Sequence, residues 1–139
     1  MDKLKSEYRS FNKAHQNRTN ILFHVFCGTI YTSSLLLLIP FNYSYLTMFF
    51  VLLTALTLGI ETAIISGVLL FIGINLMRRL KANVSLLFIM VSFYLLPEAS
   101  HYFTGEKPLL KLEDIGITDI LINIFTLLPF SVKTLLHSS

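Results

Sequence analysis

The sequence predicts an all-α fold: a polytopic integral membrane helical bundle of four to five hydrophobic helices, preceded by an amphipathic N-terminal interfacial helix. Of the 139 residues, 54% are hydrophobic and only 14% are charged, whereas charged residues make up about a quarter of a typical soluble domain. The mean hydropathy is +0.69. Because lipid is the simplest environment for so much apolar surface, we expect residues 1–139 to form a single multi-pass domain in a bacterial inner membrane or the endoplasmic reticulum.

The N-terminal residues 1–20 predict the interfacial helix, since they carry two separate stripes at helical spacing. The stripe of mostly apolar residues contains Leu4, Tyr8, Phe11 and His15. The basic stripe contains Lys5, Arg9 and Lys13. We expect a helix with this pattern to lie on an anionic membrane surface.

Four apolar segments follow and predict the membrane helices; they cover residues 21–40, 45–77, 84–103 and 115–136. The polar residues 42–44 predict a turn after the first segment, and Pro129 is expected to interrupt the last. At about 1.5 Å per residue, segment 45–77 is too long to cross a hydrocarbon core of about 30 Å as one straight helix. We therefore expect a break near Gly59 and Glu61, which would divide this segment into two helices.

The break decides which polar groups share one side of the membrane, and two arrangements are open. If residues 45–77 cross once, the N-terminal cations share a side with Arg78, Arg79 and Lys81, as the positive-inside rule prefers. If the segment folds back, the N-terminal segment gathers instead with Glu61, Glu98, His101 and Lys107. We favour the second arrangement, because it brings the unusual polar residues together and avoids an overlong helix.

Ionisable residues within or beside apolar helices are candidates for function, because they are costly there. These candidates are His15, His24, Glu61, Glu98 and His101. On one continuous helix, His15 and His24 would lie on opposite faces. A new helix capped by Asn17 or Thr19 would let His15 fold back over its first turns, where Asn20 lies four residues before His24 and can orient its ring.

A second polar cluster lies at the end of segment 84–103. Glu98 and His101 are three residues apart, so on a helix they project together, as in the Glu-x-x-His pairs of helical carboxylate metal sites. Pro97 loosens the helix beside them. Together with His15 and His24 near another predicted span, these residues predict a metal site.

Residues 15–24 read His-Gln-Asn-Arg-Thr-Asn-Ile-Leu-Phe-His and resemble the His-x-Asn-x-x-Asn-x-x-x-His box that opens the membrane 2-hydroxy fatty acid dioxygenase family. Residues 100–103, Ser-His-Tyr-Phe, followed by Glu106, Lys107 and Pro108, are similar to the family's second box. In that box, Gly-His and an aromatic stretch precede Glu-Lys and a proline. Here Ser100 stands in place of the usual glycine, and Glu106 follows His101 by five residues rather than four. The order and separation of the boxes also fit, so the resemblance spans most of the chain.

The resemblance implies an iron(II)-dependent dioxygenase of fatty acid α-oxidation. Such an enzyme uses O2 to convert a 2-hydroxy fatty acid to the acid one carbon shorter, as in the breakdown of phytosphingosine. The resemblance implies that Fe2+ is bound by His15, His24 and His101, that Glu98 or Glu106 completes the ligand set, and that Asn17 and Asn20 orient the imidazoles. The acyl tail of the substrate would lie between the helices in the membrane lipid.

Two other classes of protein remain open. A bis-histidine haem protein for electron transfer would use His24 and His101 as axial ligands. A non-catalytic lipid-binding or scaffold protein would need no metal. Nucleic acid is not an expected partner, because the net charge is only +3 and the cations flank apolar segments rather than forming a basic face. The sequence pattern leaves the oligomeric state open.

Overall fold

The computed structural model describes residues 2–80, 85–106 and 117–138, and it describes the side chains of 3–80, 85–106 and 124–138. These residues form six helices and no strand: α1 (Asp2–Ala14), α2 (Arg18–Leu38), α3 (Phe41–Leu58), α4 (Ile60–Leu80), α5 (Leu86–Thr104) and α6 (Ile117–His137). Four of them, α2 to α5, are long and apolar enough to cross a membrane. The predicted all-α membrane bundle is confirmed.

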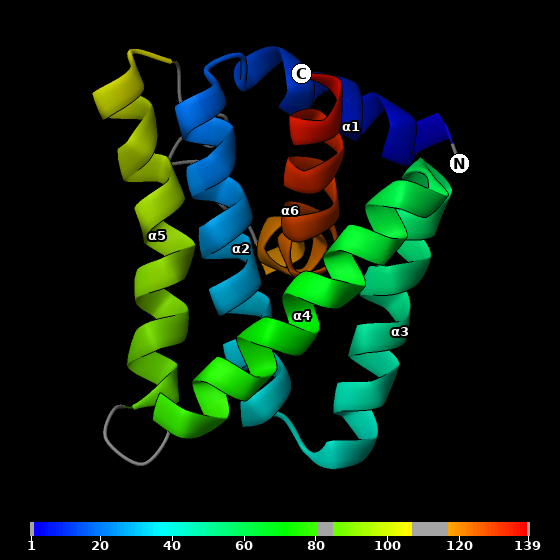
Figure 1. Cartoon of the computed structure of the whole chain (residues 1–139), viewed down its shortest axis with the longest axis vertical. Coiled ribbons are helices and arrows are strands. Elements are labelled where there is room, and N and C mark those ends of the chain that lie inside the picture. Colours follow the sequence, from blue (N-terminus) through cyan, green and yellow to red (C-terminus); the bar gives the residue numbers. More distant parts are fainter. Residues whose placement is uncertain (1, 81–84, 107–116, 139) are drawn as a thin grey trace.

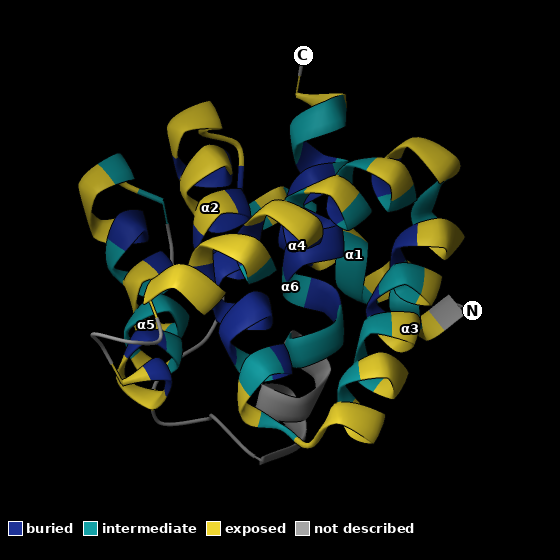
Figure 2. Ribbon diagram, turned by 60° about the horizontal axis from the view of Figure 1, so that its bottom comes forward, coloured by how far each residue is buried: buried dark blue, intermediate teal, exposed yellow. Residues whose placement is uncertain are grey.

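The bundle is built around α2 and α6 (Figure 1). Helix α2 packs against α4, α5 and α6, while α6 also packs against α3 and α4. Exposed residues line the outer faces of α3, α4 and α5 (yellow in Figure 2). They include Phe71, Phe88 and Phe103, which are 71%, 69% and 90% exposed. Large apolar side chains on the outside of the bundle suit contact with lipid rather than with water.

The predicted amphipathic helix is α1, and its apolar stripe packs on the protein. Tyr8 and Phe11 make edge-on contacts with Phe130 of α6, at ring-centroid distances of 5.7 and 5.8 Å. The cations of the basic stripe are exposed. Helix α1 therefore lies across the end of the bundle at which α2 begins (Figure 1), and holds His15 against the interior.

A sharp break at Gly59 divides the predicted segment 45–77 into α3 and α4, as expected. Gly59 has a φ of 141°, a backbone conformation that side chains disfavour. Its N–H donates to the carbonyls of Ala55 and Leu56 at the end of α3. The α3–α4 junction consequently lies at the same end of the bundle as α1, the start of α2 and the end of α5 (Figure 1), which is the arrangement favoured from the sequence. Lys107, expected at this end too, lies outside the described residues.

The predicted turn at residues 42–44 is wrong, because these residues lie in the first turn of α3. The chain reverses earlier, at Ile39 and Pro40, and the φ of −56° at Pro40 is already close to that of a helix. The Ser44 hydroxyl donates to the carbonyl of Leu36 at 2.7 Å. The polar residue thus satisfies an acceptor at the end of α2 that the helix itself leaves without a partner.

The predicted interruption of the last helix by Pro129 is also wrong, because α6 continues through this residue to His137. Pro97 likewise lies inside α5. A proline removes one backbone hydrogen bond but does not end a helix that its neighbours hold in place. Packing of α6 against α2, α3 and α4 supplies that support.

Helices α2 and α4 approach each other closely at Gly73. A Cβ atom added there would overlap Ser33 Oγ and would lie 2.9 Å from Thr29 Cγ2. Small residues allow such close packing of helices in membranes. By contrast, a Cβ atom at Gly67 of the same helix would meet Leu52 at 3.7 Å, an ordinary contact. The spacing of α2 and α4 therefore depends on Gly73.

We predict that Gly73→Ala destabilises the bundle by about 1–3 kcal/mol, the usual cost of overpacking. Gly67→Ala is the matched control, since it adds the same methyl group to the same helix. It should be neutral or slightly stabilising, because alanine has the better helix propensity. Thermal unfolding in detergent, followed by circular dichroism, measures the difference. Equal melting temperatures for the two variants would contradict the close approach at Gly73.

Candidate metal centre

His15 and His24 meet at a corner between α1 and α2. Asn17 is the N-cap of α2, and its side chain accepts a hydrogen bond from the Thr19 N–H at 2.9 Å. The corner reverses the chain, so that His15 Nε2 lies 3.1 Å from His24 Nε2. Both the predicted helix start and the predicted return of His15 over the first turns of α2 are confirmed.

The Nδ1 atom of each ring faces a backbone carbonyl oxygen, which favours the tautomer that leaves Nε2 without a proton. His15 Nδ1 lies 2.7 Å from the carbonyl oxygen of Phe11, and His24 Nδ1 lies 3.0 Å from that of Asn20. A carbonyl oxygen only accepts hydrogen bonds, so Nδ1 carries the proton and the neutral ring has its lone pair on Nε2. Two lone pairs that face each other at 3.1 Å repel unless a cation or a shared proton lies between them. The two rings are therefore oriented as a pair of metal ligands.

His101 brings a third imidazole from α5. Its ring centroid lies 4.7 Å from that of His15 and 5.1 Å from that of His24. All three side chains are at most 2% exposed. His101 Nε2 is buried and has no hydrogen-bond partner among the described residues. Because a buried polar atom without a partner is costly, this nitrogen also suits a bound ion.

The three histidines lie close enough to bind one metal ion. One ligand nitrogen from each ring lies within 4.8 Å of the others. Metal–imidazole bonds of about 2.0–2.1 Å place two nitrogens of one ion roughly 3–4 Å apart, so small movements of the rings suffice. Phe11 stacks on the His15 ring at 3.9 Å and meets the His24 ring edge-on at 5.9 Å. Its buried ring forms an apolar wall of the site.

Asn20 links the rings of α2 and α5, and it is fully buried. Its side-chain nitrogen lies 3.3 Å from His101 Nδ1 and donates to Glu106 Oε2 at 2.5 Å. Its side-chain oxygen accepts a hydrogen bond from the Ser100 hydroxyl. Its backbone carbonyl holds His24 Nδ1. Asn20 therefore contacts two of the three imidazoles, which is how residues behind a metal site orient its ligands.

Glu106 reaches the α1–α2 corner from the end of α5. Gly105 ends that helix with a φ of 72°, in the left-handed region, and turns the chain back so that the Glu106 N–H donates to the His101 carbonyl. Glu106 Oε1 then accepts hydrogen bonds from the backbone N–H groups of Gln16 and Asn17. The Glu106 carboxylate thus connects the α1–α2 corner, next to His15, with the C-terminal end of α5, next to His101.

The charges of the two groups outside the membrane helices suit a cation. Burial lowers the pKa of His15 to about 4, so its ring is neutral and able to bind metal at pH 7. Burial by itself raises the pKa of Glu106, but the hydrogen bonds from Asn20, Asn17 and Gln16 outweigh it and hold that pKa below its ordinary value. At neutral pH, a carboxylate anion therefore lies near the neutral ring of His15.

Not every predicted residue reaches the histidines. Asn17 uses its side chain as a helix cap, and only its backbone N–H contacts Glu106. Glu98 is half-buried, and its Oε2 has no hydrogen-bond partner among the described residues. Neither the Glu98 nor the Glu106 carboxylate belongs to the group of ligand atoms that lie within 4.8 Å of one another. Glu61 is exposed at the α3–α4 junction. Of the two predicted carboxylates, Glu106 is the one that the structure ties to the site, through Asn20 and the backbone.

Sequence reasoning missed two contributors, Phe11 as a wall of the site and Ser100 as a donor to Asn20. The position of each in the sequence could have identified it. Phe11 lies four residues before His15 on one helical stripe, and Ser100 directly precedes His101. The Ser100 hydroxyl thus adds a hydrogen bond to the network.

An apolar pocket of about 220 Å³ lies between α2 and α5. Asn20 and Ser100 also line it, but its accessible surface is almost wholly apolar. Phe23, Leu96 and Phe103 contribute apolar surface and are exposed on the outside of the bundle. The pocket therefore opens toward the outside of the bundle, next to Asn20 and Ser100 rather than to the histidines themselves.

Comparison of the chain with protein-family models, with curated proteins and with solved structures finds no match. The chemistry of the site is therefore inferred from its own side chains and their geometry.

We predict that the purified chain binds one divalent metal ion. His24→Ala and His101→Ala should each reduce the bound metal to less than about a tenth of the parent value, because each removes a ligand. His137→Ala is the control, since His137 is exposed at the end of α6 and bonded to the Lys133 carbonyl. Metal analysis after loading with Fe2+ or Co2+ and gel filtration gives the stoichiometry. Equal metal content in all three variants would exclude a site formed by these residues.

A second prediction separates the two carboxylates. Glu106→Ala should weaken metal affinity about ten- to a hundredfold, because Asn20 and the α1–α2 corner lose their shared acceptor. Glu98→Ala removes a carboxylate from the same helix region and should leave the affinity unchanged. Titration with Co2+, followed by its visible absorption, measures both. A larger loss in Glu98→Ala than in Glu106→Ala would make Glu98 the carboxylate of the site.

Proposed function

We propose that this chain is a non-haem iron dioxygenase that converts 2-hydroxy fatty acids to fatty acids one carbon shorter. The observation that carries the proposal is the group of three buried imidazoles of His15, His24 and His101. These are the histidines of the two boxes through which the sequence resembles the membrane 2-hydroxy fatty acid dioxygenase family.

The donor set supports Fe2+ as the metal. Neutral imidazole suits iron, zinc and copper, and an oxygenase needs coordination positions that the protein leaves open. Among the described residues, His15, His24 and His101 are the grouped ligands, with no carboxylate in the group. Three protein ligands leave room for a substrate that chelates. When bound, ferrous iron supplies the activation of O2.

A 2-hydroxy fatty acid fits the surroundings of the histidines. Its hydroxyl and carboxylate oxygens are adjacent and can chelate one metal ion. The apolar pocket between α2 and α5, with Phe23 and Leu96 in its lining, offers a place for the acyl tail. Asn20 holds His101 and His24 in position, and Phe11 covers the rings on another side. Burial of the site limits the access of water to the reacting atoms.

The proposed reaction balances without a further reductant. A 2-hydroxy acid and one O2 give the acid one carbon shorter, one CO2 and one H2O. The two carbon atoms at the carboxyl end lose four electrons, which is the number that one O2 accepts. The activity therefore requires only the metal, the substrate and oxygen.

The contacts between the rings favour a bare ion over haem. A porphyrin held by His24 and His101 would have to pass between two rings whose centroids are 5.1 Å apart. His15 also contacts both of these rings, at centroid distances of 4.3 and 4.7 Å. This crowding suits three ligands of a single small ion.

The proposal predicts oxygen uptake that depends on the 2-hydroxyl group. Iron-loaded protein supplied with 2-hydroxypalmitate and no reductant should consume one O2 for each pentadecanoate and each CO2 formed. His24→Ala and His101→Ala should lose at least about a hundredfold in rate, because metal ligands are missing, while His137→Ala should match the parent. Oxygen electrode traces and gas chromatography measure this. A Soret band in the active protein, or equal uptake with palmitate, would contradict the proposal.

A further inference from the structure

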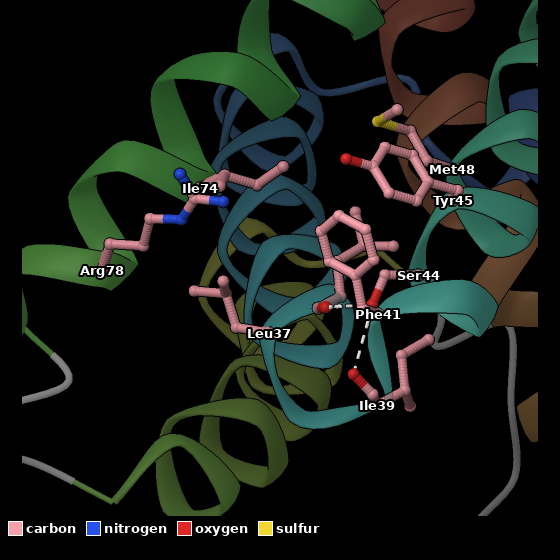
Figure 3. Close-up of a pocket in the computed structure, with 9 residues that line it drawn as sticks. Leu37, Ile39, Phe41, Ser44, Tyr45, Met48, Ile74 and Arg78 are labelled. Atoms are coloured by element: carbon pink, nitrogen blue, oxygen red, sulfur yellow. Dashed lines mark hydrogen bonds between the residues drawn. The ribbon is translucent and has the colours of Figure 1, made fainter.

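A second pocket lies at the opposite end of the bundle from the histidines. It is formed by the end of α2, the start of α3 and the end of α4 (Figure 3), and has a volume of about 290 Å³. Most of its lining is apolar, with Leu37, Phe41, Met48 and Ile74 among the walls. The pocket shares no residue with the candidate metal centre.

Three polar side chains also line this pocket. The Ser44 hydroxyl is already engaged, because it donates to the carbonyls of Leu36 and Ile39 at 2.7 and 3.2 Å. The guanidinium of Arg78 and the hydroxyl of Tyr45 point toward the space between α4 and α3 (Figure 3). Within the described residues, neither group has a hydrogen bond or ion pair with the protein. Among the described residues, Arg78 therefore has no counter-ion, and its positive charge lies beside a largely apolar cavity.

In the three helices that form the pocket, the charged residues near it are cations. Helices α2 and α3 contain no Asp or Glu, and the next acidic residue after Glu61 is Glu98. Arg78 and Arg79 lie in the last turn of α4. A guanidinium that is not neutralised by a carboxylate attracts an anion, and its planar fork matches the oxygens of a phosphate.

We propose that this pocket binds one anionic phospholipid, with part of an acyl chain among the apolar walls and the phosphate at Arg78. The volume lies just below the roughly 300–1,000 Å³ of pockets that enclose whole drug-sized ligands, so it suits a segment of a chain that continues into the bilayer. Phe41 and Tyr45, at its edge, are 69% and 54% exposed, which leaves the pocket open to lipid. The bound lipid would fill the gap between the ends of α2, α3 and α4.

A competing explanation supplies the matched control. A cation in the last turn of a helix is stabilised by the partial negative charge of the helix end, without any ligand. Arg79 is equally placed for that effect, but only Arg78 lines the pocket. Arg78→Gln and Arg79→Gln therefore remove the same charge from the same turn, and they differ in their access to the pocket.

The chain contains no tryptophan, so a single substitution gives a fluorescent reporter. Phe41→Trp places the reporter in the pocket. Phe88→Trp places it in the first turn of α5, at the same end of the bundle, on a side chain that is 69% exposed. The full chain is reconstituted in vesicles of equal parts dioleoyl phosphatidylcholine and phosphatidylglycerol, with one lipid or the other brominated on its acyl chains. The ratio of the two quenching levels reports which lipid lies beside the reporter.

In Phe41→Trp, we expect about a tenfold preference for phosphatidylglycerol, reflecting a charge-assisted contact. The preference should fall to about one when Arg78→Gln is added and should persist with Arg79→Gln. Phe88→Trp should show a preference near one. Far-ultraviolet circular dichroism verifies that each variant keeps its helices. Equal quenching by both lipids in Phe41→Trp, survival of the preference in Arg78→Gln, or an equal loss in Arg79→Gln would each overturn the proposal.

Discussion

The approach of two imidazoles to 3.1 Å inside an apolar bundle is the contact on which the site depends. Each ring is fixed by a carbonyl oxygen four residues earlier in the chain, Phe11 for His15 and Asn20 for His24. Because both protons are held on Nδ1, the lone pairs converge on one point. A cation at that point relieves both the repulsion and the cost of burying unpaired nitrogens.

This contact exists because the helix breaks between His15 and His24. Nine residues on a continuous helix would set the two rings on opposite faces. The Asn17 cap ends that continuity and starts α2 in a new direction. Glu106, about ninety residues later in the chain, holds this corner in place, because its carboxylate accepts hydrogen bonds from the backbone N–H groups of Gln16 and Asn17. The third ring, His101, is positioned by the same connection.

The bundle separates two kinds of chemistry at its two ends. The end that carries α1, the start of α2 and the end of α5 gathers the histidines together with Glu106 (Figure 1). The opposite end carries Arg78 and Arg79 in the last turn of α4, and Arg78 lines a pocket there. Between these ends, large apolar side chains face outward, while small polar ones such as Thr32, Ser33 and Ser66 lie inside the bundle. The separation means that a ligand at one end need not disturb the other.

The sequence by itself determined the class of fold, because a backbone in lipid must satisfy its own hydrogen bonds and long apolar segments therefore become helices. It also determined the break at Gly59, which is local. The Asn20 side chain, expected at His24, instead bonds Glu106 and lies against His101, and only its backbone carbonyl holds His24. Tertiary structure decided which carboxylate joins the site. The three-residue spacing of Glu98 and His101 favours Glu98, but the left-handed turn at Gly105 carries Glu106 back to the α1–α2 corner. Contacts between segments so far apart depend on how helices pack and where the chain turns, and local periodicity carries no information about either.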